Sequence, residues 1–412
     1  MVIKNNKIQR KIFFLLLLFW LITSDAFNSP MLRVLGGFYG KPLNTLLMVC
    51  LLGVLFVKRK NINIGKCHFS RFILAFIVLP FTASITSYIY QGQDFFLSLQ
   101  SAFLSYTSIL VVYYVLHAYD VSERTIIKAI IVLGVFLSLI LIVQQIFPGS
   151  AYFGVQTSEG NLSGYDMEVR NGLYRFRIRG TALVMLSAFY YWSLSLKKIS
   201  LNNGILFCIL FVGIYLFLTR QILFGSILAV FLSFFWYNGK VNKWSRYLMI
   251  FFSILAVYYL GGSFLGDLLE SSQETVNDED YVRYLSYALF WHESSSSPLL
   301  FLFGNGIPAV GSHYANYLSN LEDMGLFLSD VGCVGQGYQV GYVFIAMFYV
   351  MILVLFLKYR KYVPLYILMY VFVMAVCSVM LTPVGNMGIW AVILYICDLH
   401  INNSPFALES EA

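Results

Sequence analysis

Long apolar runs recur along the whole chain and are separated by short polar segments. An α-helix needs roughly 20 residues to cross the hydrocarbon core of a bilayer, and the several shorter runs must recruit flanking polar residues or tilt little. Twelve such runs fall at about residues 12–26, 42–57, 71–90, 95–118, 125–147, 180–196, 204–219, 221–237, 247–265, 334–357, 364–381 and 387–399. The pattern predicts an all-α, polytopic membrane protein with about 12 transmembrane helices, built as a single membrane domain over residues 1–412.

Composition supports this class and removes several others. Of the 412 residues, 59% are hydrophobic and only 11% are charged, whereas soluble globular chains carry about 25% charged residues. A water-soluble enzyme, a disordered protein and a secreted disulfide scaffold are therefore excluded. The six cysteines show neither a disulfide framework nor metal-ligand spacing. The net charge of +7 is scattered between apolar segments, so nucleic acid is not an expected partner.

Lysine and arginine are concentrated in alternate polar segments, which indicates the orientation of the chain. With a cytoplasmic amino terminus, 19 of the 27 Lys and Arg residues lie on the inner side and eight on the outer side. This bias follows the positive-inside rule, so both termini are expected in the cytoplasm. Residues 1–29 also resemble a cleavable signal, with a basic head and a short apolar core; cleavage would leave the remaining topology unchanged.

Two long segments are expected outside, at about 148–179 and 266–333. The first ends in an Arg-rich stretch in which Arg175, Arg177 and Arg179 alternate with Tyr, Phe and Ile. In an extended backbone this period of two places the three guanidinium groups on one face. Guanidinium groups grip phosphate oxygens with paired hydrogen bonds, so the stretch suits a diphosphate. Snorkelling toward lipid phosphates, or pairing with nearby acids, is the structural alternative.

Two further arginines stand alone on the predicted outer side. Arg220 interrupts an apolar stretch, and an arginine facing lipid at depth costs about 3 kcal/mol or more. It either snorkels at the outer interface or lines a wet cavity as an anion ligand. Arg283 falls in the first turn of an amphipathic helix predicted over 281–291, which suits the membrane surface. The helix dipole disfavours a cation there, which indicates either a function or neutralisation by neighbouring acids.

The second outer segment holds the candidate catalytic groups, His313 and Asp330. An outward-facing histidine near a carboxylate suits a general base, although a lone histidine more often has an ordinary structural role. His292 competes with it, and Asp330 would also suit the amino terminus of the next helix. The glycines at 304–306 mark a tight turn without the context of a nucleotide-binding motif. The sequence carries no catalytic-triad or zinc-site pattern, and no metal is expected.

Four short strings on the predicted outer side resemble, in their order, the Wzy-type O-antigen and capsular polysaccharide polymerases. These polymerases share a bacterial membrane superfamily with the O-antigen ligases. The strings are Arg177-Ile-Arg179-Gly180-Thr181, Thr219-Arg220, Arg283 ahead of Phe303-Gly304-Asn305-Gly306, and Asp330-Val331-Gly332. As topology the resemblance covers most of the chain, and the order and sidedness of the strings carry it.

The resemblance implies a glycosyltransferase of the bacterial inner membrane that acts in capsule, lipopolysaccharide or exopolysaccharide biosynthesis. Such a polymerase moves a growing glycan from undecaprenyl pyrophosphate to a lipid-linked repeat unit on the periplasmic face. Arg179, Arg220 and Arg283 match cationic positions thought to hold the pyrophosphate, and Arg175 and Arg177 extend that set.

The resemblance also bears on the base and on the partners. His313 resembles in placement the base of the ligase branch, although Tyr314 follows it where that branch has Asn. No cofactor is implied. The implied partners are the undecaprenyl-pyrophosphate-linked oligosaccharide, the lipid bilayer and a chain-length regulator. The alternatives are an O-antigen ligase and a lipid-linked oligosaccharide flippase or another transporter.

Overall fold

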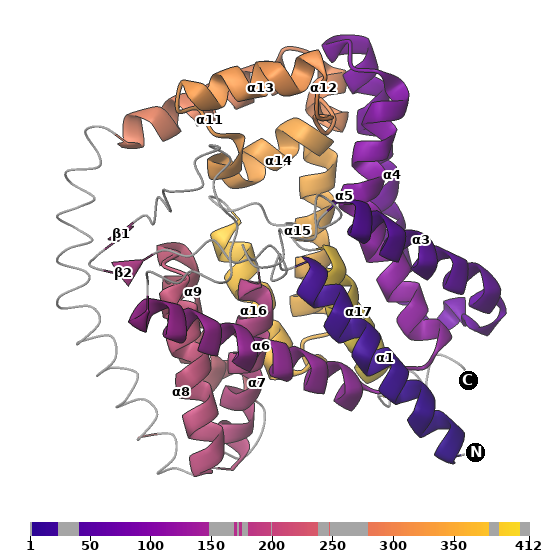
Figure 1. Ribbon diagram of the computed structural model, residues 1–412, viewed down its shortest axis with the longest axis vertical. Helices are drawn as coiled ribbons and strands as arrows, with labels where there is room; N and C mark the ends of the chain where they lie inside the picture. The colour runs from indigo at the N-terminus through magenta and orange to yellow at the C-terminus, as the bar shows by residue number, and fades with distance from the viewer. Residues whose placement is uncertain are drawn as a thin grey trace. The chain divides into compact units, whose positions relative to one another are not determined.

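The computed structural model describes residues 2–23, 41–147, 169–170, 173–174, 180–198, 200–237, 247, 279–378 and 387–403. Most of these residues are helical, which confirms the predicted helical class. The α-helices are α1 Val2–Thr23, α3 Lys41–Lys58, α4 Ser70–Gln91, α5 Phe95–Ala118, α6 Glu123–Ile146, α7 Thr181–Lys197, α8 Leu201–Leu216, α9 Arg220–Trp236, α11 Glu279–Ser295, α12 Pro298–Phe303, α13 His313–Asp323, α14 Gly332–Val340, α15 Tyr342–Leu357, α16 Leu365–Cys377 and α17 Met387–Asn402 (Figure 1).

Short elements complete the described residues. The 3₁₀ helices are η1 Arg59–Asn61, η2 Ile64–Lys66 and η4 Leu328–Val331. Strands β1 Val169–Arg170 and β2 Leu173–Tyr174 form an antiparallel hairpin, with Val169 opposite Tyr174. This hairpin is the described part of the first predicted outer segment, 148–179.

Helices coincide with the predicted apolar runs throughout the described residues, and the run at 247–265 lies almost wholly outside them. Twelve membrane crossings do not follow from this agreement. Within the described residues, α4 and α6 are long and apolar enough to cross a bilayer, and the bent pair Leu328–Val340 and Tyr342–Leu357 makes a third candidate if it is one span. The structure therefore supports a helical chain with two or three candidate spans.

The chain divides into two compact units built from interleaved segments. Unit 1 comprises Met1–Asn63, Tyr114–Arg246 and Pro364–Tyr370; unit 2 comprises Ile64–Tyr113, Tyr247–Val363 and Val371–Ala412. The expectation of a single membrane domain over 1–412 stays a prediction.

In unit 1, helices α6 and α7 pack closely because a glycine faces a serine. A Cβ on Gly134 of α6 would clash with the Ser187 hydroxyl and lie 3.0 Å from the Leu183 carbonyl. The Ser187 hydroxyl also donates to the Ile130 carbonyl at 3.1 Å. Residue numbers rise along α6 as they fall along α7, so the two helices are antiparallel. The carboxyl end of α6 and the amino end of α7 therefore lie at one end of the bundle.

In unit 2, the apolar run predicted as a span over 334–357 is formed by two helices, α14 and α15. The two helices meet at an angle of 117° at Gly341. Gly341 has φ +88° and ψ 152°, a backbone conformation that is essentially confined to glycine. Its Cα lies against the backbone of Leu302 and Phe303, where a Cβ would clash. The span predicted over 334–357 is therefore bent where this tertiary contact breaks the helix, and it stays a candidate for a single crossing.

Asp398 of α17 is a fully buried carboxylate that joins distant segments of unit 2. It accepts hydrogen bonds from the His68 amide at 3.1 Å and from the Tyr113 hydroxyl. We expect Asp398→Ala to lower the free energy of unfolding by about 3 kcal/mol, because each hydrogen bond to a charged group contributes about 1.5–3 kcal/mol. Thermal unfolding in detergent measures this loss. Asp398→Asn keeps one acceptor oxygen and should lose less, and an unchanged alanine variant would refute the role.

Candidate functional site

The first candidate region is one end of the α6–α9 bundle in unit 1, where the β1–β2 hairpin is attached. The Gln145 side chain, one residue before the end of α6, donates to the Tyr174 carbonyl and accepts from the Tyr174 amide at 3.1 Å. One side chain thus satisfies both backbone groups of the last strand residue. The hairpin is fixed to the carboxyl end of α6.

Helix α7 begins at the same end, at Thr181, after Gly180. Gly180 has φ +136°, so this entry turn favours a glycine. The positions of Tyr174 and Gly180 place both flanks of the Arg-rich stretch at this end of the bundle. Arg175, Arg177 and Arg179 fall between them and lie outside the described residues.

Helix α9 also begins at this end, at Arg220. The Ser226 hydroxyl contacts the Met185 sulfur at 3.8 Å, and the Trp192 indole donates to the Ser233 hydroxyl at 2.8 Å. Both pairs are separated by 41 residues, so α9 runs parallel to α7 in a constant register.

This register places Arg220 at the end of the bundle. At an offset of 41 residues, Gln221 of α9 is level with Gly180, and Arg220 is one residue nearer the end. Figure 1 shows α7, α8 and α9 as neighbouring helices.

Both parallel helices present backbone donors at this end. Gly180 has no side chain to cap α7, and the Thr219 hydroxyl donates to the Phe217 carbonyl at 3.3 Å instead of capping α9. Neither helix has an acidic residue in its first turn. The first amides of a helix lack intrahelical partners and carry a partial positive charge. Arg220 is half-buried beside them, so this end is a strongly favourable place for an anion.

The second candidate region lies in unit 2, around the glycine turn that follows α12. The Asn305 amide donates to the Tyr338 carbonyl at 2.7 Å, and the Gly306 amide donates to the Gln339 carbonyl at 2.8 Å. Gly304 has φ +81°, and a Cβ there would lie 2.5 Å from the Gln339 carbonyl. The turn predicted at 304–306 is thus a backbone clamp on the carboxyl end of α14.

A buried glutamine holds the segment between this turn and α13. Gln93 is 1% exposed; its amide nitrogen donates to Ser98 and Ile307, and its oxygen accepts from the Ala309 amide at 2.9 Å and the Ser312 hydroxyl at 2.8 Å. Ser312 in turn caps α13. All the hydrogen-bonding positions of this amide are therefore used to fix the start of α13.

Replacing Gln93 by leucine should loosen the 304–312 segment. The change removes four hydrogen bonds at similar side-chain volume, and each buried group left unpaired costs about 1–3 kcal/mol. Amide hydrogen exchange at Ala309 should become faster. Gln100→Leu, at an exposed position of α5, is the matched control and should leave this exchange unchanged. Equal protection in both variants would contradict the assigned role.

Glu293 of α11 is an unpredicted carboxylate at the centre of a tyrosine cluster. It accepts hydrogen bonds from the Tyr317 hydroxyl and, at 2.8 Å, from the Tyr338 hydroxyl. Burial, followed by the hydrogen bond and charge of Glu293, raises the pKa of Tyr317. Both tyrosine hydroxyls therefore act as hydrogen-bond donors to Glu293, and these bonds fix α11 against α13 and α14. The sequence gives a weak signal, an acid in a mostly aromatic helical stretch.

The predicted charged residues of unit 2 fall into two places. Arg283 is exposed on α11, and Asp330 is half-buried in η4, where the Ser329 hydroxyl contacts it at 3.3 Å. Burial and then the nearby Cys333 raise the pKa of Tyr287; the charge of Arg283 lowers it, and the charge of Asp330 raises it. The structure therefore brings Arg283 and Asp330 to the surroundings of one tyrosine. His313 is exposed as the first residue of α13.

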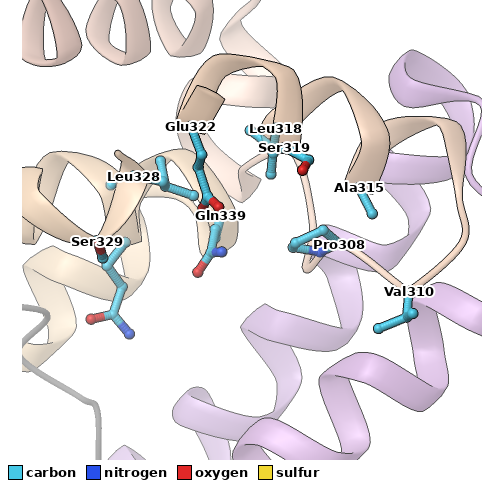
Figure 2. A pocket seen from close by; sticks show the side chains of 11 residues that line it. Pro308, Val310, Ala315, Leu318, Ser319, Glu322, Leu328, Ser329 and Gln339 are labelled. Atoms are coloured by element: carbon cyan, nitrogen blue, oxygen red, sulfur yellow. The ribbon is translucent and has the colours of Figure 1, made fainter. Parts of the chain in front are cut away.

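A pocket of about 360 Å³ opens between α13, η4 and α14 (Figure 2). Its lining residues are Pro308, Val310, Ala315, Leu318, Ser319, Glu322, Leu328, Ser329, Gly335, Gln336 and Gln339. Figure 2 shows the Glu322 side chain extending from α13 toward that of Gln339. The α13 residues that line the pocket are Ala315, Leu318, Ser319 and Glu322. With about 100° of rotation per residue, His313 lies on the opposite face of this helix, so its catalytic role stays a prediction.

Gln336 is the most constrained polar residue of this pocket. It is 2% exposed, its amide nitrogen donates to the Tyr106 hydroxyl at 3.1 Å, and its amide oxygen is buried with no hydrogen-bond partner in the described part of the chain. A buried acceptor left unpaired costs about 1–3 kcal/mol. The residues predicted for a site in this segment did not include Glu322, Gln336 or Gln339. The available signal is two amides three residues apart at the start of an apolar run.

Comparison with known proteins adds no assignment. No family model, curated protein or solved structure matches the chain.

Proposed function

We propose that this protein is a Wzy-type polysaccharide polymerase of the bacterial inner membrane. It transfers a growing glycan from undecaprenyl pyrophosphate to a lipid-linked repeat unit on the periplasmic face. The observation that carries the proposal is the end of the α6–α9 bundle, where Arg220 meets two helix amino termini whose N-cap residues, Gly180 and Thr219, make no side-chain cap. Arg175, Arg177 and Arg179 precede α7 in the sequence, and we propose that they add to the positive charge that holds the diphosphate.

The chemistry requires a stabilised leaving group. A hydroxyl oxygen of the acceptor sugar attacks the anomeric carbon of the donor glycan and forms the new glycosidic bond. The bond from that carbon to the phosphate oxygen breaks, undecaprenyl pyrophosphate leaves with the electron pair, and a base takes the hydroxyl proton. Negative charge accumulates on the diphosphate as its bond breaks, and fixed arginines and helix amides lower the energy of that transition state.

The assignment of the base is part of the proposal. Asp330 is half-buried, and its charge and that of Arg283 both act on Tyr287; we assign Asp330 and His313 as candidate bases for the acceptor hydroxyl. Arg283 is assigned to an anionic group of the substrate in unit 2. The lipid-linked oligosaccharide, the bilayer and a chain-length regulator are the proposed partners.

One observation favours a second function, a lipid-linked oligosaccharide transporter. The α14–α15 break places amide side chains on a discontinuous helix, an arrangement that transporters use for substrate sites. The helix-end anion site favours the polymerase, because a departing diphosphate needs charge stabilisation.

The experiment is complementation of a deletion strain of the source bacterium. Loss of a polymerase leaves single lipid-linked repeat units on the periplasmic leaflet, and the chain restores a glycan ladder. Loss of a transporter traps the units on the cytoplasmic leaflet. Repeat units trapped inside would overturn the polymerase and support the transporter.

A further inference from the structure

We propose that the pocket between α13, η4 and α14 binds a neutral, hydroxyl-rich ligand, one or two sugar rings, with a sugar hydroxyl hydrogen-bonded to Gln336. This sugar-binding pocket deepens the proposed function. It rests on that function for one point, which is that the bound sugar ring belongs to the acceptor repeat unit. Recognition of a neutral sugar here is chemically separate from the anion site at the end of the α7–α9 bundle.

The charge of the lining favours a neutral ligand. Among the eleven lining residues, all of which the structure describes, Glu322 is the one ionisable side chain, and none is Lys, Arg or His. A phosphate or carboxylate would meet the Glu322 charge without a compensating cation from these side chains. A hydroxyl donates to a carboxylate at no such cost, so Glu322 favours a polyol.

The hydrogen-bonding groups match sugar hydroxyls. Hydroxyl groups of Ser319 and Ser329 and amides of Gln336 and Gln339 both donate and accept, as sugar hydroxyls do. Gln336 has its nitrogen committed to Tyr106 and its oxygen unpaired. Because Gln336 lines the pocket, a hydroxyl donor bound there is the partner that its oxygen lacks among the described residues. A ligand hydroxyl can therefore donate a hydrogen bond to the Gln336 oxygen, which no group in the described part of the chain does.

The remaining lining is apolar and sets the size of the ligand. Five aliphatic residues provide a surface for the C–H groups of a sugar ring: Pro308, Val310, Ala315, Leu318 and Leu328. The volume of about 360 Å³ lies at the lower end of the roughly 300–1,000 Å³ that small-molecule sites occupy. The pocket therefore accommodates the end of a glycan and not a long chain.

The walls are fixed before a ligand arrives. Gly335 packs so closely on the Leu328 carbonyl that a Cβ would clash, which holds α14 against η4. Ser312 caps α13 and is itself held by Gln93. A preformed site loses less conformational entropy on binding than a flexible one.

The test uses the full chain in nanodiscs and the oligosaccharide released by mild acid from the lipid-linked repeat units of the same bacterium. Saturation-transfer NMR measures binding. We expect ring-proton signals in the parent protein and about tenfold weaker affinity in Gln336→Leu. Gln339→Leu should also weaken binding, and it does not disturb the bond to Tyr106. Asn320→Ala, on the other face of α13, is the control and should bind normally.

Two outcomes separate this proposal from the polymerase. Unchanged affinity in both glutamine variants, or displacement of the sugar by inorganic pyrophosphate, would overturn the pocket assignment even if polymerisation is demonstrated. Binding that depends on Gln336 in a chain that makes no polymer would uphold the pocket and overturn only its link to the acceptor. Unfolding temperatures of the variants show which of them remain folded.

Discussion

Arg220→Ala is expected to reduce the product from long glycan chains to single and very short repeat units. The side chain lies at the shared end of two parallel helices whose N-cap residues, Gly180 and Thr219, make no side-chain cap. One hydrogen bond to a charged group contributes about 1.5–3 kcal/mol, which is roughly 10–150-fold in rate if the interaction strengthens only in the transition state. The measurement is the glycan ladder in a complemented deletion strain, followed by the rate with purified lipid-linked substrate.

Two companion variants sharpen this result. Arg179→Ala should give the same phenotype. Arg179 immediately precedes Gly180 in the sequence, and Gly180 is level with Gln221 of α9. The double variant should cost less than the sum of the two single losses if both groups grip one diphosphate. Arg71→Ala, at an exposed position of α4, is the control and should leave the ladder intact. A normal chain-length distribution in Arg220→Ala would refute the anion site.

Gly341→Ala is expected to have the largest effect on stability. The backbone there has φ +88° and ψ 152°, and a Cβ would clash with the Leu302 carbonyl and lie 2.6 Å from the Phe303 Cα. Strain in this region costs about 1–3 kcal/mol before the clash with two backbone atoms is added. We expect a loss of about 3 kcal/mol or more, together with loss of the α14–α15 bend.

The matched control for this change is Gly204→Ala in α8. No atom lies within 4 Å of a Cβ there, and the helical conformation is compatible with alanine, so the unfolding temperature should stay equal or rise slightly. Thermal unfolding in detergent compares the two variants. Equal unfolding temperatures would show that the bend at Gly341 is not required for the fold.

Helices could be predicted from sequence because apolar runs of suitable length report local structure directly. Helices α6 and α9 illustrate this, because they begin at Glu123 and Arg220, close to the starts of the apolar runs predicted at 125–147 and 221–237. The bend at Gly341 could not be predicted, because the run from 334 to 357 is apolar on both sides of it. Its cause is a contact with Leu302, about forty residues earlier in the chain.

The candidate sites were predictable only in part, for a related reason. Isolated arginines on the outer side are visible in the sequence, and Arg220 is one of them. The register that brings Arg220 level with the start of α7 depends on packing between Met185 and Ser226. Gln93 and Ala309 are 216 residues apart, and no local pattern joins them. Polar residues whose partners are distant look like ordinary loop residues until the fold brings the partners together.

The most direct test of the central claim is reconstitution of the purified chain in proteoliposomes with the lipid-linked repeat unit as the sole substrate. The account predicts a ladder of elongated, lipid-linked glycans and release of one undecaprenyl pyrophosphate for each bond formed, both strongly reduced in Arg220→Ala. Movement of the repeat unit across the bilayer without any elongation would contradict the account.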